Sequence, residues 1–158
     1  MEKKTKNGLI VTALILGVGY FLYKKFKGSP APSNAEIDAV LGGNTGANPT
    51  LSVDKLKEIA DKIYVAFNGY GTDVNGNNGL INQFALLRNN DDLMGLIAAY
   101  GIREVGGGMW NPLPNFKGNL VQTISDELSN SEISQINSII VKSGITIRFN
   151  PDGTLTTL

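Results

Sequence analysis

An uncharged apolar run near the start of the chain constrains its fold more than any other feature. The run extends from Asn7 to Tyr23, 17 residues reading NGLIVTALILGVGYFLY, with lysines on both sides. At about 1.5 Å of rise per residue, a helix of this length spans roughly 25 Å, the short end of what a bilayer core requires. We therefore expect residues 1–27 to be a single transmembrane anchor with basic flanks, and residues 7–26 to contact the lipid bilayer.

Three other structures compete with an anchor for this run. A cleaved signal peptide would need a small-residue cleavage site, but the run ends in YKKFK. A buried core helix or an interfacial helix would show a polar stripe, and none is present from Leu9 to Leu22. Ala13 and Gly17 form a small-xxx-small pair that favours a homo-oligomer of anchors. The side chains expected to face lipid are Leu9, Ile10, Val11, Leu14, Ile15, Leu16, Val18, Phe21 and Leu22.

Charge and residue types exclude several functions. The 14 basic and 14 acidic residues balance, but residues 28–158 hold eight basic and 13 acidic residues, a net charge of −5. An acidic domain does not neutralise phosphates, so we expect no nucleic-acid partner. The chain has no cysteine and no histidine. This excludes disulfides, Cys/His zinc sites and Ser-His-Asp catalysis, and leaves oxygen-ligand calcium sites and carboxylate enzymes.

The remainder of the chain reads as a mainly α protein. Residues 28–50 are rich in Gly, Pro, Ser and Asn, which predicts a flexible linker with one short helix near residues 35–41. Residues 51–144 carry helical apolar periodicity and predict a compact domain of five short helices. Residues 145–158 alternate on both sides of a Pro-Asp-Gly turn and predict a C-terminal β-hairpin.

Capping residues divide the domain into its helices. Ser52 begins the first, and the second carries the apolar residues from Leu80 to Leu87. Asn90 and Asp91 are expected to cap the third helix, and Asn119 the fourth, through residue 128. Ser129 and Glu132 form a capping box for the fifth, which Gly144 ends. Between the third and fourth helices, GIREVGGGMWNPLPNFKG predicts a long loop.

The order of five helices, with FNGYGTD before the second, AAYGIRE at the end of the third and LVQTISDELS in the fourth, resembles a single annexin repeat. The resemblance covers roughly residues 52–143. It implies calcium as a candidate cofactor, bound by the main-chain carbonyls of Phe67, Gly69 and Gly71 and by the Glu127 carboxylate. Annexins carry several repeats and no transmembrane anchor, and the NGNN stretch and the glycine-tryptophan loop look like insertions.

The GYGTD loop admits two interpretations. Calcium prefers several oxygen ligands with at least one bidentate carboxylate, and Gly69 and Gly71 allow the sharp turn that points carbonyls inward. The simpler interpretation is a glycine turn in which Thr72 or Asp73 caps the second helix. An Asn/Gly-rich loop is also typical of ordinary connecting segments.

The loop at residues 105–118 is the second candidate site. Met109, Trp110 and Phe116 lie there among glycines and prolines, which indicates a contact loop for a partner or a membrane surface. The alternative is an Ω-loop that folds Trp110, the only tryptophan, back onto the core.

Catalytic residues are difficult to identify. Glu58 and Asp73 could form the carboxylate pair of a muralytic enzyme, which needs two acids flanking a sugar cleft. Glu58 lies, however, among Lys55, Lys62 and Asp61 on what reads as a solvated helix face. We therefore expect no enzyme.

The expected function is a non-catalytic, membrane-anchored structural or adaptor protein that links a bilayer to other structural proteins of an assembly. The setting is the internal membrane of a bacteriophage virion or a bacterial envelope. The virion is preferred because the chain is small and carries few features expected of a regulated signalling protein. The alternatives are a calcium-dependent membrane-binding module and a tether of a secretion complex, and the muralytic enzyme ranks last.

Overall fold

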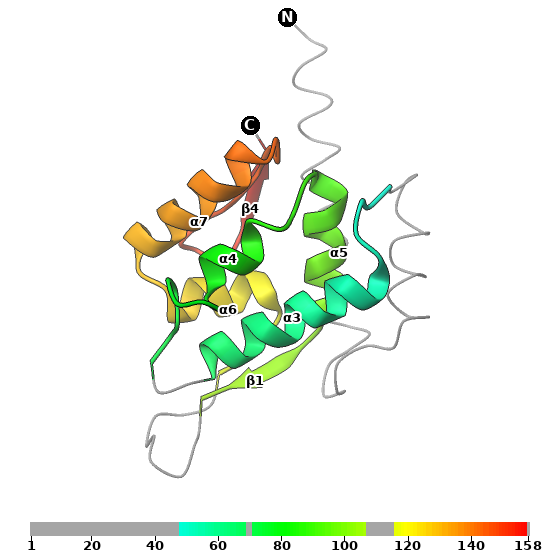
Figure 1. The fold of residues 1–158 in the computed structure, drawn as a ribbon. Helices are drawn as coiled ribbons and strands as arrows, with labels where there is room; N and C mark the ends of the chain where they lie inside the picture. The colour runs from blue at the N-terminus through cyan, green and yellow to red at the C-terminus, as the bar shows by residue number, and fades with distance from the viewer. Residues whose placement is uncertain (1–47, 69–70, 107–115, 158) are drawn as a thin grey trace, which may run out of the picture.

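The computed structural model describes residues 48–68, 71–106 and 116–157 (Figure 1). The transmembrane anchor, the Ala13–Gly17 contact and the linker up to residue 47 lie outside these residues. None of the helices in the described part of the chain has both the length and the apolar character that a membrane crossing requires.

The described region is mainly helical, as predicted, with five helices and two small antiparallel hairpins. The helices are α3 (Val53–Phe67), α4 (Leu80–Phe84), α5 (Asn90–Tyr100), α6 (Leu120–Glu127) and α7 (Asn130–Lys142). The strands are β1 (Arg103–Val105), β2 (Phe116–Gly118), β3 (Ile147–Phe149) and β4 (Leu155–Thr157). The predicted C-terminal hairpin is confirmed as β3–β4, with Phe149 opposite Leu155.

Local hydrogen bonds explain where the helices begin. The side chain of Ser52 accepts a hydrogen bond from the Lys55 amide at the start of α3. Asn119 and Ser129 each form a complete capping box, for α6 and α7. Gly144 follows α7 with a φ of 81°, a left-handed conformation that glycine adopts without strain.

Two predictions of local structure were wrong. The cap of α5 is Asn89, one residue before the expected pair, and its side chain accepts from the Asp92 amide. The stretch expected to be a loop also contains two strands, since β1 and β2 pair with Val105 opposite Phe116. The hairpin escaped the sequence pattern because residues 106–115 separate its strands, whereas the equally short strands β3 and β4 flank a Pro-Asp-Gly turn.

One hydrophobic core joins all five helices and β3. α3 packs against α5, and β1 runs along α3 on the side away from α4 and α7 (Figure 1). The rings of Phe84 in α4 and Phe149 in β3 meet edge to face at 5.6 Å between centroids. The core therefore draws on elements from both ends of the described region.

Candidate functional site

The GYGTD loop leaves α3 and leads to α4, and hydrogen bonds hold it on both sides. The amide of Asp73 donates to the Ala66 carbonyl (3.0 Å), and the amide of Leu80 donates to the Asp73 carbonyl (3.0 Å). The Asp73 carboxylate accepts from the Gly76 amide (2.7 Å) within the loop. Gly71 has a φ of 87°, which makes glycine the favoured residue at this turn.

The expected cap of the second helix is wrong. The residue before α4 is Gly79, which offers no side chain to the helix amides. The Asp73 carboxylate instead closes a turn inside the loop by accepting from the amide of Gly76, three residues later. The polar residues of GYGTD therefore order the loop rather than start the helix.

Glu127, the last residue of α6, lies at this loop. The Thr72 side chain lies close enough to the Glu127 carboxylate to lower its pKa. Partial burial raises the pKa of Glu127, the neighbouring Asp126 charge raises it further, and the Thr72 side chain lowers it. The structure thus brings together two segments far apart in the sequence, the loop and the carboxylate that the annexin resemblance pairs with it.

The donors available for a cation here are few. Phe67 ends α3 and Gly71 lies in the loop, while Gly69 falls outside the described residues. Among the residues that the structure describes, no group of three or more acidic side chains could hold a metal ion. A calcium ion at this loop would therefore rest on main-chain carbonyls and on Glu127 as the main carboxylate.

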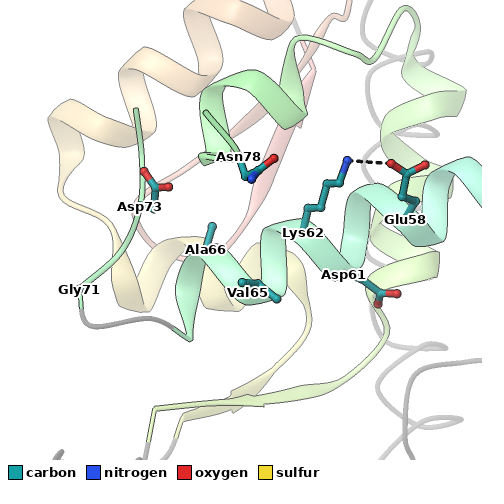
Figure 2. Close-up of a pocket in the computed structure, with 8 residues that line it drawn as sticks. All are labelled: Glu58, Asp61, Lys62, Val65, Ala66, Gly71, Asp73 and Asn78. Carbon is teal, nitrogen blue, oxygen red and sulfur yellow. Dashed lines mark hydrogen bonds and ion pairs between the residues drawn. The ribbon is translucent and has the colours of Figure 1, made fainter. Parts of the chain in front are cut away.

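A pocket of about 570 Å³ opens between α3 and the same loop (Figure 2). Lys62 extends along α3 toward Glu58, while Asp73 and Asn78 lie on the loop across from Ala66. Both members of the expected carboxylate pair, Glu58 and Asp73, line this pocket. The lining residues are Glu58, Asp61, Lys62, Val65, Ala66, Gly71, Asp73 and Asn78.

The carboxylates around this pocket already have partners. Glu58 binds the ammonium groups of Lys55 (2.8 Å) and Lys62 (2.7 Å), and these contacts lower its pKa to about 2. Asp61 binds the guanidinium of Arg103 at 2.8 Å. Because Glu58 is ionised at neutral pH, it holds no proton to donate as the general acid of a glycosidase.

Arg103 forms a partly buried cluster with Asp61, Tyr64 and Tyr100 that the sequence did not reveal. Its guanidinium carbon lies 5.2 Å from the ring centroid of Tyr64 and 5.0 Å from that of Tyr100. Its Nε donates to the Tyr100 carbonyl at 2.8 Å, and only 9% of the side chain is exposed. The sequence signal was an arginine directly after the apolar end of the third helix, in AAYGIRE. The cluster links α3, α5 and β1 by cation–π contact and charge.

The second candidate site, the loop at residues 105–118, begins at the end of β1, two residues after Arg103. The amide of Gly106, just after β1, donates to the Asn68 side chain at 3.1 Å, so the two loops start side by side. Met109 and Trp110 lie outside the described residues. Phe116 is half-buried in β2, and its ring covers Gly118, where a Cβ atom would meet the ring at 2.7 Å. The Phe116 ring therefore packs over its own strand.

No family model, curated protein or solved structure matches this chain.

Proposed function

We propose that this protein is a non-catalytic, membrane-anchored adaptor that holds a small helical domain at a bilayer and links it to other proteins of a structural assembly. The observation that carries the proposal is the core of the described region. Its buried hydrophobic residues, from Leu56 to Leu155, pack against one another across all five helices. The described domain thus has a core of its own, and the apolar run of residues 7–23 is long enough in the sequence to serve as a bilayer anchor.

Flotation of the full chain with lipid vesicles tests the anchor. We expect the chain to float with the vesicles and to resist extraction at high salt, because salt screens charge contacts but does not weaken apolar burial. Leu14→Glu places a charge at the centre of the run, which costs about 3 kcal/mol in a bilayer, and should reduce flotation strongly.

Val65→Glu is the matched control, because Val65 is an apolar residue that is 68% exposed on α3. This variant should float like the parent chain. Equal flotation of Leu14→Glu and the parent, or failure of the parent to float, would contradict the anchor.

The contact between Thr72 and Glu127 favours a second candidate function, a calcium-dependent membrane-binding module of annexin-like type. The contact brings a carboxylate to a glycine turn, as calcium sites built on loop carbonyls require. Calorimetric titration of the full chain with calcium, with magnesium as comparison, tests it. Under this proposal Glu127→Gln abolishes calcium binding, while Asp126→Asn, which alters the exposed neighbour, leaves most of it.

A partner-binding role for the loop around Met109 and Trp110 belongs to the adaptor proposal. It gains support from the hydrogen bond between Gly106 and Asn68, which joins the base of this loop to that of the GYGTD loop. The bases of the two loops therefore lie side by side. Trp110→Ala should weaken retention in that assembly without changing flotation.

A further inference from the structure

A buried carboxylate in the first turn of α5 fastens the beginning of the described region to the core. Asp92 is fully inaccessible to solvent. Its carboxylate accepts hydrogen bonds from the Thr50 amide (2.6 Å), the Thr50 hydroxyl (2.7 Å) and the Leu51 amide (3.1 Å). It also accepts from the Arg88 amide at 2.9 Å. One side chain therefore holds two consecutive residues that precede α3.

The neighbouring residues of the same turn extend this junction. The amide of Asn48 donates to Asp91 at 2.9 Å, and the side chain of Asn89 donates to the Asn48 carbonyl at 3.1 Å. On the opposite side, Asn90 exchanges two hydrogen bonds of 2.9 Å with Thr146, between α7 and β3. Four consecutive side chains, NNDD, thus join three parts of the chain.

We propose that this junction is a mechanical clamp, which takes up tension arriving through the residues before Asn48 and keeps it from α3. The proposal rests on the membrane anchor proposed above, since an anchor is what would pull on this segment. α3 begins at Val53, and its first core residue is Leu56. Without the clamp, a pull would act directly on the first turn of α3 and unwind it from its end, where helices fray first.

The chemistry of the junction suits this role. Hydrogen bonds to a carboxylate are stronger than those between neutral groups, and exclusion of water strengthens them further. The bonds from Thr50 and Leu51 converge on one carboxylate, so they share the load instead of opening one after another. The Asp92 side chain is inaccessible to solvent and its donor Thr50 is exposed, so these bonds are partly buried.

Single-molecule pulling on the full chain in detergent micelles tests the clamp. One end is held through a tag on the N-terminus, and the other through Gln135→Cys, an exposed position on α7 that becomes the only cysteine. Both attachments are covalent, so the result does not depend on whether residues 7–26 cross a bilayer. A chain that fails to float with vesicles yet shows the clamp would overturn the anchor alone.

The measured quantity is the rate of the first extension step at constant force. Thr50→Val keeps the shape of the residue and removes the hydroxyl bond, so we expect the step to accelerate about tenfold. Asp92→Asn should accelerate it further. Thr146→Val is the matched control. It also removes a hydroxyl bond to the first turn of α5, but residue 146 lies after the attachment at position 135 and so carries no tension.

Urea unfolding without force separates the clamp from general stability. Thr50→Val and Thr146→Val should lose similar free energies of unfolding, and only Thr50→Val should accelerate extension. An unchanged rate in Thr50→Val, or equal acceleration in both variants, would overturn the clamp. Since Thr50→Val leaves the caps of α3 and α5 intact, the test stands even if Asp92→Asn fails to fold.

Discussion

Asn137 on α7 forms two hydrogen bonds with the main chain of Phe149 in β3. Its side-chain amide donates to the Phe149 carbonyl at 2.9 Å, and its carbonyl accepts from the Phe149 amide at 3.0 Å. One polar side chain thus satisfies both main-chain groups of a residue that is only 2% exposed.

Asn137→Ala should therefore destabilise the domain. It leaves a buried donor and a buried acceptor unpaired, for a loss of about 2 kcal/mol or more in the free energy of unfolding. Urea denaturation of the full chain measures this. Gln135→Ala, an exposed position on the same helix, should change the midpoint little. Equal midpoints for both variants would show that the Asn137 bonds contribute nothing.

Arg103→Met should lower the free energy of unfolding by about 1–2 kcal/mol, because it removes cation–π contact with Tyr64 and Tyr100. Asp61→Asn removes only the ion pair to an acid that is 64% exposed, so it should cost less than about 1 kcal/mol. If Asp61→Asn proved as damaging as Arg103→Met, the ion pair rather than the stacking would hold the cluster.

One of the five tyrosines should ionise late in an alkaline absorbance titration. Burial raises the pKa of Tyr100 to about 12, against an opposing hydrogen bond to Thr123. Because the folded-state pKa lies above the unfolded value of about 10, stability is present below pH 10 and is lost as pH rises toward 12. Tyr100→Phe should remove this late step, and Thr123→Val should shift it to higher pH.

The contributions of Glu127 and Glu132 to the stability of the domain should change with pH in opposite directions, measured with calcium removed by a chelator. Burial raises the pKa of Glu127, so its contribution to stability is lost as pH rises through the folded-state pKa, and Glu127→Gln should melt no lower than the parent at neutral pH. Hydrogen bonds from Ser129 lower the pKa of Glu132, so its contribution is lost as pH falls.

Glu132→Gln should accordingly lower the melting temperature at neutral pH, and its deficit should shrink at acid pH. Thermal melts across the acid range compare the two variants. The same direction of change in both would contradict the opposite environments of the two carboxyl groups.

Fluorescence of Trp110 should separate a contact loop from one folded onto the core. It is the only tryptophan of the chain, so its emission reports on one position. For a contact loop we expect emission like that of tryptophan in water and ready quenching by acrylamide. Blue-shifted emission with little quenching would favour the Ω-loop.

Features governed by nearby residues could be predicted from the sequence. Ser52, Asn119 and Ser129 cap their helices because each bonds an amide three residues ahead. The cap of α5 was misplaced by one residue because NNDD offers four polar side chains in a row. Which of them caps depends on what the others bind: Asp91 binds Asn48, Asp92 binds Thr50 and Asn90 binds Thr146.

Contacts between distant segments could not be predicted from periodicity. The Arg103 cluster draws on α3 and α5, and β1 pairs with a strand beyond a long connection. The position of Glu127 beside Thr72 was expected only from the annexin resemblance, since no spacing rule joins this loop to the end of α6 when α4, α5, β1 and β2 lie between them.

The short strands of the two hairpins affect how copies of this protein would contact one another when crowded on a surface. Each strand has only three residues, so the free edges offer few main-chain donors and acceptors to another chain. Short edges are poor templates for strand addition between molecules. Many copies confined side by side in two dimensions would thus meet through helices and loops, and would be protected from coalescing into aggregated sheets.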